Sequence, residues 1–212
     1  MSFISSATDV PSVAWANRPD ATIAGADARI IINDLPSGAR GQWHSDGTVW
    51  KPCNPIVLFD NTSAVVGIAS VAEQILKQAV IPGSLLRGLR TFDVVFTLSK
   101  SGATDAVTTT SIRFGPLGTT GDTAVYSTSQ FTAPNRQYSG GCEWFASSDT
   151  TIRTRPVNQN VAPLSGSPLA GAFPTQSVVS NLSVGNFFLS VTAIMAGTTD
   201  TPSGNHLMII GF

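Results

Sequence analysis

Apolar and polar residues alternate along several stretches in the second half of the chain. Around residues 89–98 one parity is apolar, and the same period of two recurs at 108–114 and 186–196. The apolar positions are Phe92, Val94, Phe96 and Leu98, then Ile112 and Phe114 behind Thr108 and Thr110, then Phe187, Leu189, Val191, Ala193 and Met195. Because successive strand residues point to opposite faces, each stretch predicts a strand with one buried face.

Shorter runs rich in β-branched and aromatic residues predict further strands at 29–33, 56–59, 142–146, 151–155 and 206–212. The apolar run at 206–212 would aggregate if left free, so we expect it to pair inside a sheet or an oligomer interface. Residues 71–82 fit neither period cleanly. They are interpreted as a strand because their neighbours are strands and Pro82-Gly83 is typical of a turn.

No stretch predicts a helix, and turn signals recur every ten to fifteen residues or so. The fold class is therefore all-β, an antiparallel β-sandwich. A jelly roll is the preferred version, although the strand pattern does not fix the order of the strands.

The sharpest local signal is a hairpin at residues 42–51. Asp46-Gly47 suits a two-residue type I′ turn, in which both residues need positive φ. Such a turn would pair His44 with Val49 and Trp43 with Trp50, placing the two indoles opposite each other. Residues 29–52 then form a three-stranded meander, which is too small to be stable alone.

The hairpin divides the chain into two predicted regions. Residues 1–54 form an N-terminal lead with the hairpin, and 55–212 form the jelly-roll-like sandwich. Trp15 stands apart in the polar lead, and two interpretations stay open. It anchors the lead on the main domain, or it inserts into a partner subunit.

Composition limits the function classes. Apolar residues make up 42% of the 212 residues and charged residues only 12%, with a net charge of −1. Soluble domains carry roughly 25% charged residues, so this chain has few charges with which to cover its surface. No cluster of Lys and Arg predicts binding to nucleic acid or to an anionic membrane. The first residues do not resemble a signal peptide, and no apolar run is long enough to span a bilayer.

Candidate chemistry is sparse. His44 and His206 lack partners at metal-ligand spacing, so we expect no metal and no cofactor. No catalytic motif is present, and many aspartates lie in turns, where they bond their own backbone. We therefore expect no enzyme activity. We favour free thiols at Cys53 and Cys142, and Ser139-Gly-Gly-Cys142 is interpreted as a bulge or turn before a strand.

Two elements together resemble tailed-bacteriophage virion surface proteins. Trp43-His-Ser-Asp-Gly-Thr-Val-Trp-Lys-Pro resembles the Ser-Asp-Gly-Thr-x-Trp hairpin of tail and fibre proteins. Ile81-Pro-Gly-Ser-Leu-Leu, followed by an alternating strand, resembles the Ile-Pro-x-x-Leu-Leu element of phage jelly-roll domains. The resemblance implies a homotrimer on the virion surface, in a tail fibre, spike or tail tip or as a capsid decoration or head fibre, bound to other virion proteins.

The sequence thus predicts a non-enzymatic structural protein acting in assembly and host contact, without membrane insertion. Trp15, Trp43 and Trp50 are the candidates for attachment, and loops 115–123 and 158–175 are expected to face solvent or the host. Two alternatives stay open. A carbohydrate-binding module would bind a host surface glycan with Trp144, which has Glu143 beside it, or Tyr138 as the stacking platform, because an aromatic face can stack on a sugar ring. A polysaccharide depolymerase would need paired acids.

Overall fold

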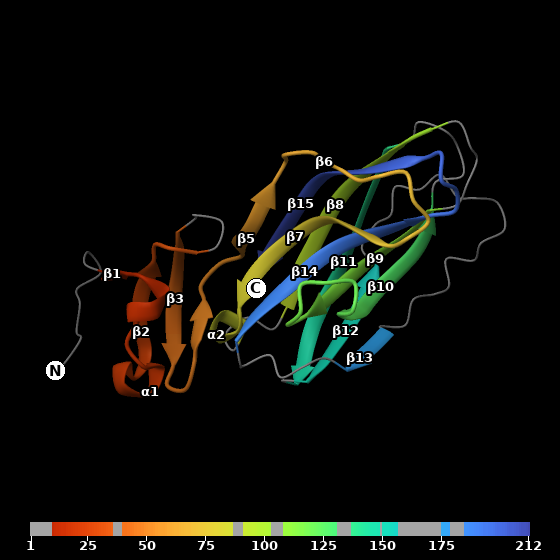
Figure 1. Ribbon diagram of the computed structural model, residues 1–212. Helices are drawn as coiled ribbons and strands as arrows, with labels where there is room; N and C mark the ends of the chain where they lie inside the picture. Colours follow the sequence, from red (N-terminus) through yellow and green to blue (C-terminus); the bar gives the residue numbers. More distant parts are fainter. Residues whose placement is uncertain are drawn as a thin grey trace.

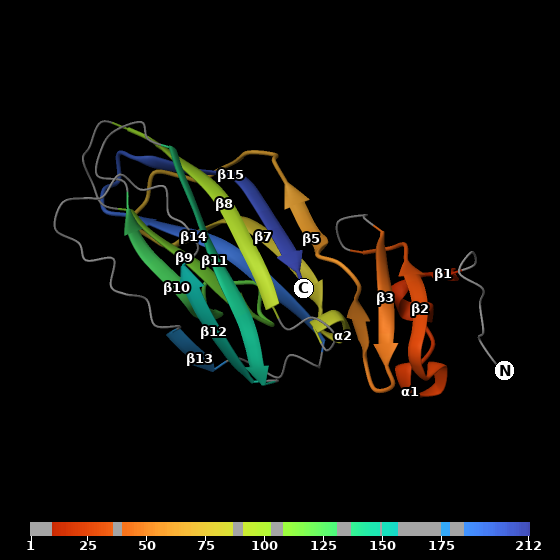
Figure 2. The ribbon, with the colours of Figure 1, turned by 180° about the vertical axis from the view of Figure 1, so that it is seen from behind.

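The computed structural model describes residues 10–35, 40–86, 91–102, 108–130, 137–148, 150–156, 175–178 and 185–212. Within these ranges the chain forms three β-sheets (Figure 1). A small N-terminal sheet lies at one end of two larger sheets, and the C-terminus lies between them and the small sheet (Figures 1 and 2). The all-β prediction is confirmed.

The N-terminal sheet has four strands in the order β1-β2-β3-β4. They are β1 (Ser12–Val13), β2 (Ala26–Ile32), β3 (Gly41–Asp46) and β4 (Trp50–Pro52). Strands β2 to β4 form the expected meander, and β1 adds a parallel strand beside β2. A 3-10 turn, η1 (Trp15–Asn17), and one helical turn, α1 (Ala21–Ala24), connect β1 to β2.

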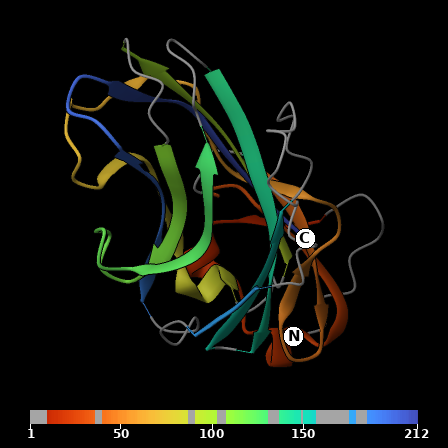
Figure 3. The same ribbon diagram turned by 90° about the vertical axis from the view of Figure 1, so that its right-hand side faces the viewer.

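The larger sheets face each other as a sandwich (Figure 3). One has the order β13-β12-β11-β8-β15-β5, with β6 also paired to β15; the other has the order β10-β9-β14-β7. The strands are β5 (Ile56–Asn61), β6 (Val65–Val66), β7 (Gln74–Pro82), β8 (Thr91–Ser101), β9 (Thr108–Gly115), β10 (Thr123–Gln130), β11 (Gln137–Ser148), β12 (Thr151–Pro156), β13 (Thr175–Val178), β14 (Asn186–Met195) and β15 (Thr201–Gly211).

The strand order is that of a jelly roll. Without β6, β12 and β13, eight described strands of the sandwich remain. Neighbouring strands follow the order β5-β15-β8-β11 in one sheet and β7-β14-β9-β10 in the other. This is the double-sheet arrangement of two Greek keys. Strands β12 and β13 extend the first sheet beyond β11. The preferred fold is confirmed.

The alternating stretches supply the core between the sheets. All the apolar positions named in the pattern of β8, β9 and β14 are 1% exposed or less. The terminal apolar run lies in β15, between β8 and β5, so the expectation that it pairs inside a sheet is confirmed. Residues 74–82 form the expected strand β7, and one helical turn, α2 (Gly83–Leu86), follows where we expected a simple turn.

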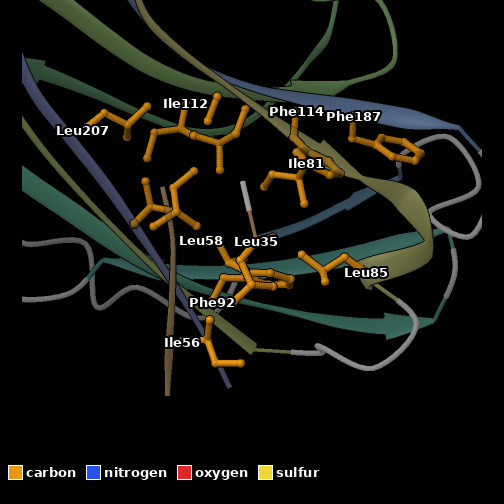
Figure 4. Close-up of a cluster of buried hydrophobic side chains, with 14 of the residues drawn as sticks. Leu35, Ile56, Leu58, Ile81, Leu85, Phe92, Ile112, Phe114, Phe187 and Leu207 are labelled. Atoms are coloured by element: carbon orange, nitrogen blue, oxygen red, sulfur yellow. The ribbon is translucent and has the colours of Figure 1, made fainter. Parts of the chain in front are cut away.

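The N-terminal sheet is joined to the sandwich by direct packing. Leu35, which follows β2, points into the same buried cluster as Leu58, Leu85 and Phe92 (Figure 4). At Gly41 an added Cβ would lie 2.7 Å from Cδ1 of Ile56 and 3.2 Å from Cδ1 of Leu35. The backbone of β3 therefore approaches the side chains of Ile56 and Leu35 closely, and a larger residue at Gly41 would require them to shift.

The predicted hairpin register is wrong. Strands β3 and β4 pair His44 with Lys51 and Ser45 with Trp50, so Trp43 faces Pro52 rather than Trp50. Gly47 has φ of +89°, whereas Asp46 does not have the positive φ that a type I′ turn requires. Instead, one carboxylate oxygen of Asp46 accepts hydrogen bonds from the amides of Thr48 and Val49. With this side-chain cap, the last pair of the two strands is Ser45 with Trp50, and four residues, 46–49, lie between them.

The interpretation of Ser139-Gly-Gly-Cys142 is also wrong. These residues lie inside β11 and pair with β8 without a register shift, Gly140 opposite Phe96 and Gly141 opposite Val95. A Cβ at Gly141 would lie 2.7 Å from the carbonyl oxygen of Val94. The two glycines therefore mark a place where the backbones of β11 and β8 approach closely, rather than a turn.

Candidate functional site

The three tryptophans proposed for attachment are buried inside the folded protein. Trp15, Trp43 and Trp50 are 9%, 0% and 4% exposed. The rings of Trp15 and Trp43 are 4.9 Å apart at 53°, and the guanidinium of Arg18 lies 3.8 Å from the centre of the Trp15 ring. Of the two interpretations of Trp15, the structure places it as an anchor in the core of its own chain.

Local hydrogen bonds hold the lead over the N-terminal sheet. The amide of Trp15 donates to Asp34 at 2.5 Å, and the indole Nε1 of Trp50 donates to the carbonyl of Pro19 at 2.8 Å. Asp20 caps α1 by accepting from the amide and the hydroxyl of Thr22. These hydrogen bonds, led by the one from the Thr22 hydroxyl, lower the pKa of Asp20. The lead and the sheet thus form one packed unit around the indoles.

The residues proposed for sugar binding are divided by the strand register. Glu143 stands opposite Asp93 and Arg155, whereas Trp144 stands opposite Phe92 and Thr154, both of which are buried. Adjacent strand positions belong to opposite faces of a sheet. Glu143 and Trp144 therefore do not share a face.

Tyr138 occupies β11 opposite Leu98, which is buried, and has the parity of Trp144 rather than of Glu143. Six positions along a strand separate Tyr138 from Trp144, about 20 Å at the usual rise. Tyr138 and Trp144 therefore occupy separate positions along β11, as two alternative platforms would.

Asp93 is a candidate acid that sequence reasoning missed. It lies directly opposite Glu143 on neighbouring strands, 50 residues earlier in the chain, and both residues are half-buried. Directly opposed positions bring Cβ atoms to about 5 Å. No local pattern links the two residues, because their proximity depends on the pairing of β8 with β11.

A polar network covers the outer face of the β10-β9-β14-β7 sheet of the sandwich. Arg113 donates from Nε to Oε1 of Glu73 at 2.6 Å and from Nη2 to Oε2 at 2.7 Å. Its Nη1 donates to the carbonyl of Asp122 at 2.7 Å, and the hydroxyl of Thr192 donates to Glu73 at 2.5 Å. Two parallel bonds between a guanidinium and a carboxylate form a strong, directional pair.

The network lowers the pKa of Glu73. Partial burial opposes the charged carboxylate, but the hydrogen bonds from Arg113 and Thr192, together with the positive charge of Arg113, outweigh that effect. The balance holds Glu73 ionised and paired. The pair therefore has a structural explanation that requires no chemistry on a substrate.

The 116–122 loop is held against this face. The carboxylate of Asp122, 3% exposed, accepts from the amides of Leu117 at 3.0 Å and Gly118 at 2.8 Å. Gln78 donates to the carbonyl of Gly118 and to the hydroxyl of Ser190, both at 3.0 Å. Leu117 is the one large apolar residue of the loop and is 63% exposed. The prediction that this loop faces solvent is confirmed at Leu117, while residues 158–174 lie outside the described ranges.

Two buried lysine side chains bond to other residues of the sandwich. The side chains of Lys100 and Asp200 form an ion pair at 3.0 Å and are 1% and 0% exposed. Lys77 donates to both oxygens of Asn61 and to the carbonyl of Ser63, and so ties β7 to the end of β5. Desolvation lowers the pKa of Lys77.

The histidines and cysteines form no metal site in the described ranges, where no three metal-ligating side chains meet. His206 contacts Asp60 at 2.9 Å, and Nδ1 of His44 lies 3.7 Å from Sγ of Cys53. The backbone partner of His44 on β4 is Lys51 and not Val49. Both cysteines are free, and burial raises the pKa of Cys142. A buried thiol of this kind is a poor nucleophile.

The most exposed apolar segment connects β5 to β7. We define the 62–72 arm as residues 62–72, which include β6. It holds four of the nine large apolar residues that are exposed in the described ranges: Val65 at 43%, Val66 and Ile68 at 68%, and Val71 at 55%. Sequence reasoning placed Val71 at the start of a strand, but β7 begins at Gln74. No described helix is long and apolar enough to span a membrane.

Comparisons with known proteins assign no family. No protein-family model and no curated protein sequence match the chain. The chain is similar to the CBM2 module of the evolved Dit of Lactobacillus casei BL23 phage J-1, with a TM-score of 0.32 and 10% identity over 63% of this chain and 67% of that one. It is also similar to structures of infectious bursal disease virus, strains Gx and Gt. Their TM-scores are 0.32 and 0.30, with 10% and 12% identity over 87% and 88% of this chain and 42% and 43% of theirs.

Proposed function

We propose that the protein is a non-enzymatic structural component of a tailed-bacteriophage virion. It would be a homotrimer on the surface of the tail or the capsid, bound to other virion proteins, and it would act in assembly and host contact. The two resembling sequence elements suggest this role, and the fold is compatible with it, because jelly rolls form viral capsid domains. Since jelly rolls also form lectin domains, the fold does not choose between these functions.

The observation that carries the proposal is the joint between the N-terminal sheet and the sandwich. Gly41, two residues before Trp43 of the first resembling element, lies close to the side chains of Leu35 and Ile56, and Trp43 belongs to the same buried cluster. Leu85, from the second element, points into the same cluster as Leu35 (Figure 4). The two elements, about forty residues apart in the chain, therefore build one buried joint. A packed joint of this kind would transmit a fixed orientation from an attachment region to a displayed sandwich.

The low charge supports a role in assembly. The buried centres of protein-protein interfaces are depleted in charged residues, and only 12% of this chain is charged. The indoles contribute by making the N-terminal sheet rigid rather than by direct contact, because they are buried. The attachment surface would be the outside of that sheet.

The test is the mass of the purified protein in solution, measured by light scattering over a range of concentrations. We expect a trimer of three times 22.1 kDa. A protein that remains a monomer at every concentration would contradict the trimeric role.

A glycan array addresses the carbohydrate-binding alternative. Because Glu143 and Trp144 do not share a face, we expect no glycan signal that Trp144→Ala and Glu143→Gln both abolish. The depolymerase alternative is favoured by one observation, the opposition of Asp93 and Glu143. We expect no polysaccharide cleavage; a cleavage that is lost in both Asp93→Asn and Glu143→Gln would establish that alternative instead.

A further inference from the structure

We infer that the 62–72 arm is a contact surface between copies of this chain, and that a second copy covers its exposed apolar side chains. This inference rests on the proposed function, because it names the surface through which the homotrimer would form. The arm runs along the margin of the sandwich towards the end opposite the N-terminal sheet (Figures 1 and 3). A contact there would leave the N-terminal sheet available for attachment.

The arm is apolar on both faces. Val65 and Val66 are neighbours in β6 and both are exposed. Since adjacent strand residues point to opposite faces, both faces of this short strand meet solvent. Strand β6 pairs with β15 along one edge, at Ser203 and Gly204, and with no other described strand. An apolar strand with an open edge is a template for pairing with another chain.

The arm is also held in a fixed shape. Gln74 accepts from the amide of Ile68 at 2.7 Å and donates to its carbonyl at 2.8 Å, so one side chain clamps one residue twice. The amide of Gly67 donates to the carbonyl of Pro202 at 2.8 Å, and the hydroxyl of Ser70 accepts from the amide of Ala72. These bonds hold the backbone in place while Ile68 remains exposed. A surface ordered in advance loses less entropy when it binds.

Charge and area favour a second copy as the partner. Residues 62–72 contain no charged side chain, so the arm offers nothing to an acidic or a basic partner. Three identical uncharged apolar arms can meet around the threefold axis of a trimer with no like-charge repulsion. The four exposed side chains present roughly 400 Å² over the two faces of the arm together, within the range of the largest apolar patch of a typical monomer, which is often functional. That is about half of the roughly 800 Å² per partner in a standard interface, and neighbouring residues would supply the rest.

The experiment compares the wild-type protein with the double variant Val66→Asp, Ile68→Asp and with the control Leu117→Asp. All three substituted side chains are more than 60% exposed, so each variant should fold. Leu117 lies on the 116–122 loop, outside the arm. Circular dichroism and the urea midpoint verify folding, and light scattering over a dilution series gives the association constant.

We expect the double variant to associate at least 100-fold more weakly than the wild type, while Leu117→Asp remains unchanged. Two charges buried without partners in an apolar contact account for a loss of that size. If the wild type and the double variant both form trimers, the inference about the arm is overturned and the proposed trimer stands. The same conclusion applies if Leu117→Asp dissociates equally. A wild-type monomer contradicts both. An oligomer of another size that the double variant disrupts supports the arm and contradicts the trimer.

Discussion

The 62–72 arm and the 116–122 loop are two surface connections of the same sandwich, and they differ in how many apolar side chains they expose. The loop is secured by charged groups, since Arg113 and Asp122 bond its ends and its amides. The arm is held by Gln74 at Ile68, by the carbonyl of Pro202 at Gly67 and by Lys77 at Ser63, and it exposes four apolar residues. The loop contains a single large apolar residue, Leu117, which is exposed, whereas the arm contains four. The arm leaves its apolar groups exposed, which is why we assign it a partner.

The largest expected effect is on the free energy of unfolding, when the ion pair beside the 116–122 loop is broken. Arg113→Met should lower the free energy of unfolding by about 3 kcal/mol, the lower end of the range for breaking a buried ion pair. The side chains of Arg113 and Glu73 are 18% and 15% exposed, which places the pair at that end. Urea unfolding measures the loss, and association through the arm should be unchanged.

Arg153→Met is the matched control, because Arg153 is exposed on β12. Its substitution should change stability by less than about 0.5 kcal/mol. If Arg113→Met costs no more than Arg153→Met, the charged network does not secure the loop.

We expect an intermediate loss of stability when the two hydrogen bonds between Gln74 and Ile68 in the arm are removed. Gln74→Leu keeps the size of the side chain but removes both hydrogen bonds to Ile68, and should cost about 1–2 kcal/mol. Hydrogen exchange at the amide of Ile68 should become faster, and association should weaken because the arm is no longer ordered in advance.

The corresponding substitution for the 116–122 loop is Gln78→Leu, which removes the hydrogen bonds from Gln78 to Gly118 and Ser190. Exchange should then become faster in the 116–122 loop and stay unchanged at Ile68. Equal responses of both segments to either variant would show that arm and loop are one cooperative unit.

The smallest expected effect is a dependence on pH. The folded-state pKa of Glu73 is held below its ordinary value, so its contribution to stability is complete above the unfolded-state pKa, about 4.3, and is lost as pH falls through the folded-state value. The wild-type free energy of unfolding should therefore fall more steeply with acid than that of Glu73→Gln. Urea titrations at a series of acidic pH values give the two slopes, and parallel slopes would contradict this role for Glu73.

Much of the sandwich could be predicted from local pattern. The apolar parity of β8, β9 and β14 identified buried positions correctly, because side-chain direction in a strand depends only on its period of two. The ambiguous residues 71–82 were assigned correctly by their neighbours from Gln74 onward, although the first two belong to the arm and Glu73 precedes the strand. The hairpin failed in register because Asp46 caps the loop with its side chain, an alternative that the Asp-Gly pair does not distinguish from a type I′ turn.

The candidate sites could not be predicted in the same way. Glu73 and Arg113 are 40 residues apart, and Asp93 and Glu143 meet only because β8 pairs with β11. The sequence placed Glu143 and Trp144 side by side, whereas the sheet assigns them to different faces. The role of the three tryptophans likewise depended on burial, which no single-strand pattern specifies for residues in a lead and a hairpin.

The sequence by itself determined the all-β class, the inward faces of the long strands, the low charge and the uncharged composition of residues 62–72. The tertiary structure decided the jelly-roll strand order, the hairpin register, the joint through Leu35 and Gly41, and the exposure of the arm. The physical reason is that alternation is a property of a single strand. Pairing, close approach and solvent exposure are properties of segments that meet only after the chain has folded.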